Sequence, residues 1–190
     1  DKYGRDEVIV ITRSNKRANR YNEGIRRYNL SAEEAIESGD MLMVVKNNYH
    51  YTERIENCPM SFMANGDVAQ LKKIRRFEDF YGFHFAEAIL QFPDYNDTEI
   101  ACKILLDTIT SESPSLTREE SRRLFDEVEK DYTDIKSKIK RLKEIRENPH
   151  YNAVQVKFSY ASTCQKAQGG QWSAVFVDRC LFGEEPMSRD

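Results

Sequence analysis

Short apolar runs near both ends of the chain constrain its fold more than any other feature. Residues 7–11 have the composition of a buried strand, and residues 174–177 form a second such run. A polar loop at 12–14 follows the first run, and apolar residues then recur every three to four positions, as on one face of a helix. The positions concerned are Ala18, Tyr21, Ile25 and Tyr28. A buried strand, a loop and an amphipathic helix in series predict an α/β fold.

The loop after the first strand is a candidate ligand site because of its position. In open α/β folds, ligands bind where the chain leaves the carboxyl end of a strand, which here places residues 12–15 at the site. Six basic residues follow between Arg13 and Arg27, against the single acid Glu23. A plain helix cap by Ser14, with a solvated basic face, accounts for the same residues. Position alone leaves both interpretations open.

Residues 39–92 have the pattern of a small β-barrel. The run at 41–45 is hydrophobic, Asn65, Gly66 and Asp67 form a tight-turn signal, and aromatic and aliphatic residues alternate from Phe83 onward. Several aromatics stand beside basic residues, as in proteins that stack single-stranded bases. The core and rim of a barrel explain most of these aromatics better. The aromatics are Tyr49, Tyr51, Phe77, Phe80 and Tyr81, and the basic residues are Lys46, Lys72, Lys73, Arg75 and Arg76.

A helical arm is predicted after the barrel. Thr117 and Glu120 have the spacing of a capping box, and apolar residues from Leu124 to Ile145 follow at alternating spacings of four and three. The pattern indicates one long helix or a broken pair that ends before Pro149. Its basic last turns suit the helix dipole as well as a DNA backbone, and a solvated face is the simpler explanation.

Composition excludes several classes of protein. The net charge is −3, and 11% aromatic residues predict a folded chain rather than a disordered one. The longest apolar runs span four residues, far below the roughly 20 that a membrane helix needs. The four cysteines and three histidines lack zinc-ligand spacing, so no metal site is expected. Without a disulfide framework or signal peptide, a cytoplasmic location is expected.

The most specific motif lies at residues 160–172, which read YASTCQKAQGGQW and lead into AVFVD at 174–178. It resembles motif V of superfamily-one helicases, especially the RecD-like and Dda-like branch. The resemblance implies that Thr163, Gln165 and Lys166 contact the phosphates of single-stranded DNA. Two departures are Gln165 in place of the family's usual histidine and Gln171 in place of an acid that often follows the glycine.

The same resemblance assigns a nucleotide-facing side to the end of the motif, at Gln168, Gly169 and Gln171. Glycines let a backbone approach a phosphate closely. On a helical turn, a spacing of two residues separates side chains by roughly 200°, so Lys166 and Gln168 are expected to face different surfaces. One short element would then touch both DNA and nucleotide.

Upstream residues extend the resemblance. Residues 11–15, with Asn19, Asn22 and Arg26, look like the strand and helix that open the second RecA-like domain, which implies that Thr12, Arg13 and Asn15 reach the DNA backbone. The pairs and triplets at 39–40, 47–48 and 65–67 are similar to turns of the Src-homology-3-like barrel inserted before motif V. The expected division is a fragmentary RecA-like (P-loop NTPase-type) parallel-sheet domain at 1–38 and 151–190, the inserted barrel at 39–92 and the helical arm at 93–150.

The function implied is that of an ATP-dependent DNA helicase. The chain lacks a G-x-x-x-x-G-K-[ST] phosphate loop, starts without methionine and ends before the arginine of motif VI. We therefore expect a piece of a longer parent, with no catalytic residue of its own. The full-length parent would use ATP and Mg²⁺, and none is expected to bind this part alone. Expected partners are single-stranded DNA and an N-terminal RecA-like domain.

Three alternatives remain open at this point. The barrel and the basic helix could form a stand-alone nucleic-acid-binding module. A DNA exonuclease, as part of an exodeoxyribonuclease V alpha-type complex, would need clustered carboxylates for metal ions, and the acids at 94–112 show no such pattern. A protein-interaction role for the long helix is compatible with the helicase interpretation.

Overall fold

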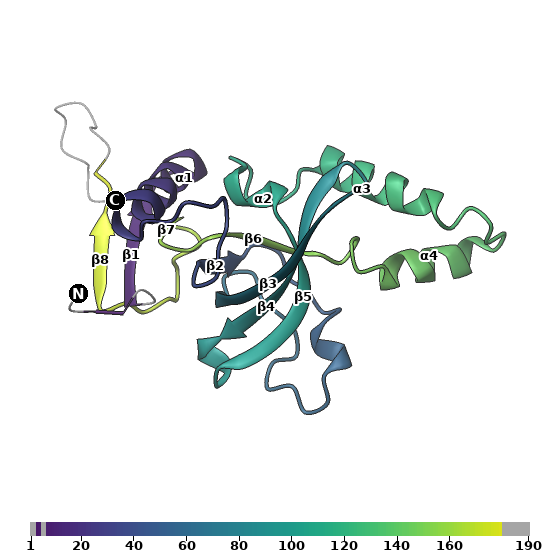
Figure 1. The fold of residues 1–190 in the computed structure, drawn as a ribbon, viewed down its shortest axis with the longest axis horizontal. Helices are drawn as coiled ribbons and strands as arrows, with labels where there is room; N and C mark the ends of the chain where they lie inside the picture. The colour runs from purple at the N-terminus through teal and green to yellow at the C-terminus, as the bar shows by residue number, and fades with distance from the viewer. Residues whose placement is uncertain (1–2, 5–6, 180–190) are drawn as a thin grey trace, which may run out of the picture.

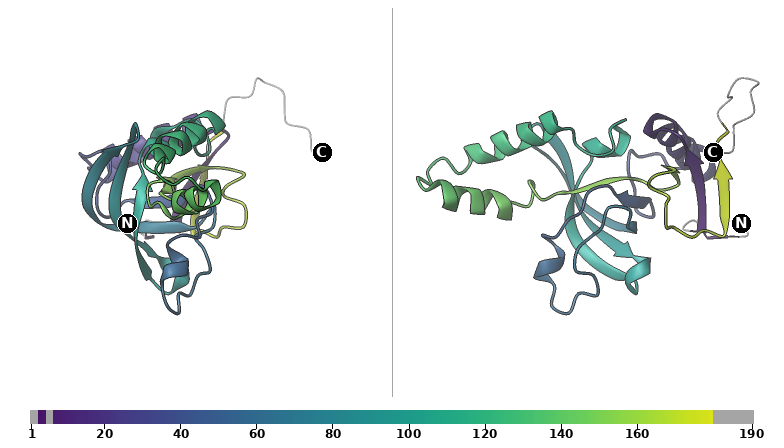
Figure 2. Two further views of the ribbon diagram at one scale, coloured as in Figure 1. Left: turned by 90° about the vertical axis from the view of Figure 1, so that its right-hand side faces the viewer. Right: turned by 180° about the vertical axis from the view of Figure 1, so that it is seen from behind.

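A computed structural model describes residues 3–4 and 7–179 of the chain. A small parallel sheet lies at one end of the molecule, a closed β-barrel in the middle and a pair of helices at the other end, as Figure 1 and the right-hand view of Figure 2 show. The fold is therefore α/β with a separate all-β unit. The prediction of a parallel sheet together with a small barrel is confirmed at this level.

The sheet places β1 (Val8–Thr12) between β7 (Ala161–Thr163) and β8 (Ala174–Val177), and both neighbours run parallel to it. After β1 come α1 (Asn15–Gly24) and a short π-helix (Ile25–Asn29). The Asn22 side chain fastens α1 to β7: its amide donates to the Ala161 carbonyl at 3.0 Å, and its Oδ1 accepts from the Ala161 N–H at 2.7 Å. The predicted strand, loop and helix are confirmed.

The barrel consists of five strands: β2 (Met41–Val44), β3 (Val68–Phe80), β4 (Phe83–Phe92), β5 (Thr98–Leu105) and β6 (Val154–Phe158). They close in sequence order, with β6 returning to β2, and only β5 and β6 pair in parallel. Short 3-10 turns lie at Thr52–Arg54 and Pro93–Tyr95. Gly66 adopts a φ of 109° in the predicted turn, where the Asp67 carboxylate accepts from the Ala64 N–H at 2.7 Å.

The barrel extends further along the chain than predicted. Strand β5 lies in the range assigned to the helical arm, and β6 lies in the range assigned to the sheet domain, yet both are barrel strands. Closure explains the difference, because a small barrel needs enough strands to pair both edges. The boundaries at 92 and 151 are therefore wrong. The arm is an insertion between β5 and β6.

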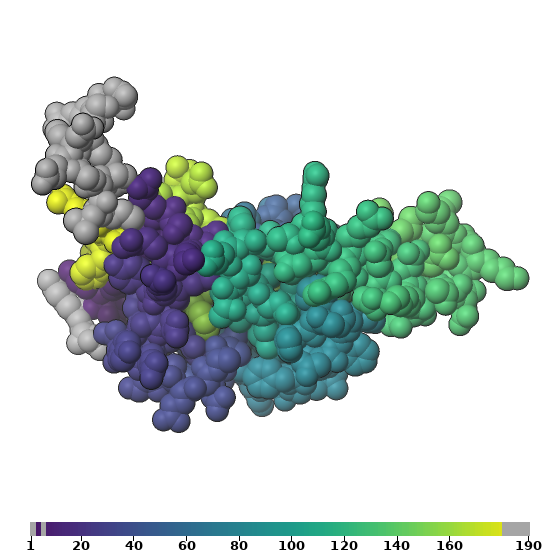
Figure 3. Space-filling view, turned by 90° about the horizontal axis from the view of Figure 1, so that it is seen from above, coloured from purple at the N-terminus to yellow at the C-terminus, as the bar shows by residue number. Residues whose placement is uncertain are grey.

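Three helices lie between β5 and β6, namely α2 (Asp107–Thr110), α3 (Arg118–Lys130) and α4 (Lys138–Glu147), and the last two form the arm. The capping box of Thr117 and Glu120 is present, and the helix pattern is a broken pair rather than one helix. Part of the predicted apolar stripe, namely Leu124, Val128 and Ile145, packs with the β3–β4 hairpin, whereas Ile139 is 83% exposed. Their shared core contains Phe83, Phe85, Leu105, Leu124, Val128, Ile145 and Ala153. Seen from above, the arm projects away from the rest of the molecule (Figure 3).

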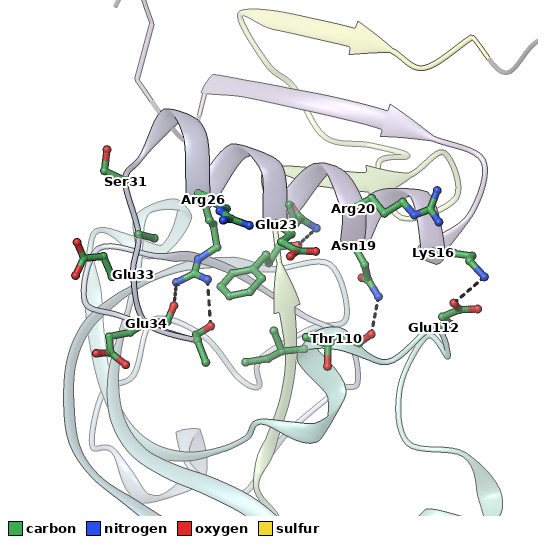
Figure 4. A pocket seen from close by; sticks show the side chains of 16 residues that line it. Lys16, Asn19, Arg20, Glu23, Arg26, Ser31, Glu33, Glu34, Thr110 and Glu112 are labelled. Carbon is green, nitrogen blue, oxygen red and sulfur yellow. Dashed lines mark hydrogen bonds and ion pairs between the residues drawn. The ribbon is translucent and has the colours of Figure 1, made fainter.

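A buried ion pair joins the sheet part to the barrel. Arg26, in the π-helix after α1, donates from Nε and Nη2 to the two carboxylate oxygens of Asp40 at 2.8 and 2.9 Å. Its guanidinium lies 4.3 Å from the centre of the Phe158 ring, and Tyr160 donates to Asp40 at 3.2 Å. The Arg26 side chain also donates to the Glu34 carbonyl (Figure 4). Four segments of the chain meet at this junction.

Among the described helices, none is long and apolar enough to cross a membrane.

Candidate functional site

The three parallel strands end together at one edge of the small sheet. Thr12 on β1 is in register with Thr163 on β7, and the Cys164 N–H donates to the Thr12 carbonyl at 3.1 Å. At the end of β8, the Asp178 N–H donates to the Ile11 carbonyl at 2.8 Å. Carboxyl ends of parallel strands are where open α/β folds bind ligands. This edge, at residues 12–17, 163–166 and 178, is called the strand-end edge below.

The loop from β1 to α1 contains three residues that the resemblance assigned to DNA, and they differ in accessibility. Thr12 is 1% exposed, and its hydroxyl donates to the carbonyls of Ser14 and Ser162 at 3.0 and 3.4 Å. Thr12 therefore shapes the loop instead of facing a ligand. Arg13 is exposed and Asn15 is half-buried at the start of α1. The Ser14 hydroxyl accepts from the Arg17 N–H at 3.3 Å, which confirms its predicted role as a cap.

Arg17 and Asp178 form an ion pair at this edge that the sequence did not reveal. The guanidinium donates from both Nε and Nη2 to the carboxylate, with the Nη2 bond at 2.9 Å. The Asp178 carboxylate is almost fully covered. An acid directly after a buried strand and an arginine in the basic run were the available signals. The pair ties α1 to the end of β8.

After β7 the motif forms a single turn. The Thr163 carbonyl accepts from the N–H groups of Lys166 and Ala167 at 3.0 and 3.1 Å, and no further helical turn follows in this segment. Gly169 has a φ of 86°, a backbone conformation that residues with a side chain rarely adopt. A Cβ built on Gly170 would lie 2.0 Å from the Trp172 ring, so a side chain there would displace the tryptophan. The local structure of this loop therefore explains why glycine is present at both positions.

Lys166 lies on the barrel side of the strand-end edge. Its ammonium donates to the Pro114 carbonyl at 3.4 Å, and burial lowers the pKa of its side chain. Lys157 on β6 lies nearby and donates to the Thr108 carbonyl at 2.8 Å. Burial, with a smaller contribution from the charge of Lys166, lowers the pKa of Lys157 to about 8. Two lysines therefore face the segment that joins α2 to α3.

The residues assigned to the two ligands meet in one cavity. Gln165 and Lys166, assigned to DNA, line the same space of about 680 Å³ as Gln168, Gly169 and Gln171, assigned to nucleotide. Because the segment is a turn rather than a helix, a spacing of two residues does not place Lys166 and Gln168 on opposite surfaces, and that expectation is wrong for this conformation.

Carboxylates also line this cavity, namely those of Glu7, Asp67 and Asp94, together with the Trp172 ring. Burial raises the pKa of Asp67. Among the described residues that line the space, Lys166 is the one cation. Charge repulsion makes this cavity a poor phosphate site by itself.

The basic face of α1 borders a second and larger groove of about 1060 Å³ (Figure 4). Lys16 pairs with Glu112 at 3.3 Å, and the Asn19 amide donates to the Thr110 carbonyl at 2.8 Å. Arg20 lines the same groove, and acids from the segment after the π-helix face it. The groove is therefore lined by both basic and acidic side chains.

The aromatic residues of the barrel divide into structural and accessible groups. The Tyr51 hydroxyl accepts from the Lys103 N–H and donates to the Pro149 carbonyl, and Tyr81 donates to Asp131 in the arm. Phe77 and Phe80 on β3 are 60% and 52% exposed. Exposed basic residues accompany them on β3, namely Lys72, Lys73, Arg75 and Arg76, of which Arg76 pairs with Glu78 and Glu87.

Within residues 3–4 and 7–179, no group of three or more histidine, cysteine or acidic side chains is placed to hold a metal ion. Cys58, Cys102 and Cys164 are free thiols, and Cys180 lies outside the described residues. Comparison with known proteins returned no matching family model and no matching curated protein.

Proposed function

We propose that the chain is the second motor domain of an ATP-dependent helicase that acts on single-stranded DNA. In this proposal the small sheet is RecA-like, the barrel is the Src-homology-3-like insertion of the RecD-like and Dda-like branch, and the arm is an addition to that barrel. The single observation that carries the proposal is the juxtaposition, at the strand-end edge, of the β1–α1 loop and the motif at 160–172. Both segments were assigned to DNA from sequence alone.

The chemistry of the strand-end edge suits a phosphodiester backbone. The N-terminus of α1 directs amide N–H groups toward the edge, Arg13 is exposed beside them and Thr163 ends the neighbouring strand. Amide groups at a helix start, an arginine and a hydroxyl are the groups that proteins commonly place on DNA phosphates. Arg13, Asn15 and Thr163 would make these contacts, with Gln165 at the rim.

The loop after β7 offers a route from DNA to nucleotide. It runs from Thr163 through Gly169 and Gly170 to β8, whose end is fixed by the Arg17–Asp178 pair. A separate RecA-like domain with the phosphate loop would bring ATP and Mg²⁺ against Gln168, Gly169 and Gln171. A shift of this short loop would then alter the grip of Thr163 on DNA, which is a coupling free energy between two sites.

A binding experiment tests the DNA half of this proposal. Fluorescence anisotropy of a labelled single-stranded oligonucleotide should show weak binding that declines with salt. Arg13→Ala should weaken it and flatten the salt dependence by about one counterion. Arg122→Ala on the exposed face of α3 is the matched control and should change nothing. Equal behaviour of the two variants, or no binding at low salt, would contradict the proposal.

A stand-alone nucleic-acid-binding module is the second candidate, and the exposed Phe77 and Phe80 beside Lys73 and Arg75 favour it. Stacking of bases on such rings contributes to sequence-tolerant binding. Phe77→Ser would then abolish more of the affinity than Arg13→Ala. The reverse order supports the motor-domain proposal.

A further inference from the structure

A separate cavity of about 350 Å³ lies between the barrel and the base of the arm. The barrel loop at residues 46–54 forms one wall, and the segment at 146–153, which leads from α4 into β6, forms the other. Its volume falls within the range of small-ligand sites. None of its lining residues belongs to the strand-end edge.

Two residues that line this cavity each have a buried polar atom without a hydrogen-bond partner among the described residues: Oδ1 of Asn48 and Nε2 of His50. Each residue is only 9% exposed. The Asn48 amide nitrogen already donates to the Asn152 carbonyl at 2.7 Å, which orients the side chain. Burial, followed by the charge of Arg54, lowers the pKa of His50, so its ring is neutral and one ring nitrogen accepts while the other donates. Unpaired buried polar atoms are rare in folded proteins and point to a missing partner.

The rim of the cavity combines aromatic rings with charges of both signs. Tyr49 is exposed, and its ring centre lies 4.7 Å from that of Phe62. The ring centres of Tyr151 and Phe125 are 5.9 Å apart. Lys46 and Arg54 supply positive charge, and Arg54 pairs with Glu147 at 2.9 Å. The acids at the rim disfavour a bare anion in the cavity. Flat, partly exposed rings favour a flat ligand.

We propose that this cavity receives one unstacked nucleobase, with its sugar and phosphate directed toward Lys46. An amino group on the edge of the base would donate to Oδ1 of Asn48, and a ring nitrogen would pair with Nε2 of His50. The base face would lie on Tyr49 or Tyr151. Single-stranded nucleic acids are recognised in this way, through base edges and stacking. The inference rests on the proposed function, because a DNA strand held at the strand-end edge is one source of the base, and a free nucleotide is the other.

The His50 ring makes the site directly observable by NMR, and His84, which does not line the cavity, acts as an internal control. Imidazole nitrogen resonances of the full chain would be followed by NMR during titration with a single-stranded oligonucleotide, an abasic strand of equal length and deoxyadenosine monophosphate. We expect the Nε2 resonance of His50 to shift with the oligonucleotide and not with the abasic strand. A shift with the mononucleotide alone supports the same ligand chemistry and identifies a free nucleotide as its source.

Two variants sharpen the test. His50→Phe should weaken binding of the base-containing strand about tenfold and leave abasic binding unchanged, because a ring without nitrogens cannot pair with a base. His84→Phe is the matched control. Lys46→Ala, on the exposed rim, serves if His50→Phe fails to fold, and it should weaken oligonucleotide binding more than Lys73→Ala does.

The failures are distinguishable. Equal binding of base-containing and abasic strands, with no shift of His50 from any probe, means that water serves the two buried atoms. That result overturns the nucleobase site but leaves the DNA contact at the strand-end edge intact. Absence of binding by every strand, with His50 unmoved, overturns both proposals.

Discussion

Strands β6 and β8 show how differently the two β units of this molecule are completed. All five residues of β6 (VQVKF) are buried, including Lys157, whereas β8 (AVFV) is more apolar and yet exposes Val175, Phe176 and Val177. Strand β6 pairs with β5 on one side and β2 on the other, while β8 has β1 as its one neighbour among the described strands. Closure of the sheet, rather than apolarity, decides which strand is buried.

The difference suggests that the two units depend on different interactions. The barrel and the arm have extended cores of their own. The small sheet depends on α1 and on the junction of Arg26 with Asp40, which anchors it to the barrel. Four experiments test this contrast.

Removal of Arg26 should have the largest effect. Arg26→Met leaves the Asp40 carboxylate buried without its ion partner, which should lower the free energy of unfolding by about 3–5 kcal/mol. Urea denaturation followed by circular dichroism measures it. Lys16→Ala removes an exposed pair with Glu112 and should cost under about 1 kcal/mol. Similar losses for the two variants would mean that the junction does not hold the units together.

Truncations within the two units should differ by several-fold. Leu90→Ala in the barrel, where the side chain is fully buried, should cost about 2–5 kcal/mol. Phe176→Ser on β8, where the ring is 62% exposed, should stay within about 0.5 kcal/mol. Thermal melting of both variants provides the comparison. A large loss from Phe176→Ser would show that β8 is buried in solution.

Lys157 should make the barrel more stable at alkaline pH. Its pKa in the folded protein is about 8, against an ordinary value of 10.5, so the unfolded chain binds more protons between these values. Stability therefore rises with pH across that window, by up to about 3 kcal/mol. Lys157→Met removes this pH-dependent contribution to stability. The rise in unfolding free energy from about pH 7.5 to about pH 10.5 should be larger in the unmodified protein than in Lys157→Met, and parallel pH profiles would contradict the assignment.

Loss of the capping box in the arm should have a smaller effect than loss of Arg26, Leu90 or Lys157. Thr117→Ala removes the side-chain acceptor of the Glu120 N–H and should cost about 1 kcal/mol. Because the arm packs on the hairpin and not on the sheet, hydrogen exchange should accelerate in α3 and leave β1 unchanged. Faster exchange in β1 would show that the units are coupled more strongly than their contacts indicate.

Local patterns in the sequence predicted the elements better than their grouping. The Ser14 cap, the Thr117–Glu120 box and the turn at Gly66 depend on neighbouring residues, and all three are present. Assignment of β5 and β6 to the barrel depends on pairing between distant segments, which no local pattern records.

The buried face of α1 and of the π-helix after it was predicted less well. Tyr28 fits the apolar spacing but is exposed, while the polar residues Asn22 and Arg26 are buried, because they bond to β7 and to Asp40. At the site, sequence placed Arg13 and Thr163 at a strand end but could not foresee the Arg17–Asp178 pair or the cavity shared by Lys166 and Gln168. Each of these arises from tertiary contacts of polar side chains, for which apolar periodicity carries no signal.

In the motor-domain proposal, the strand-end edge, and not the barrel surface alone, holds single-stranded DNA. Hydrogen–deuterium exchange of the full chain, with and without a saturating oligonucleotide, distinguishes the two surfaces. Exchange should become slower at residues 13–18 and 162–172, with β8 unchanged. Protection confined to β3, around Phe77 and Phe80, or no protection at the strand-end edge, would contradict the motor-domain proposal.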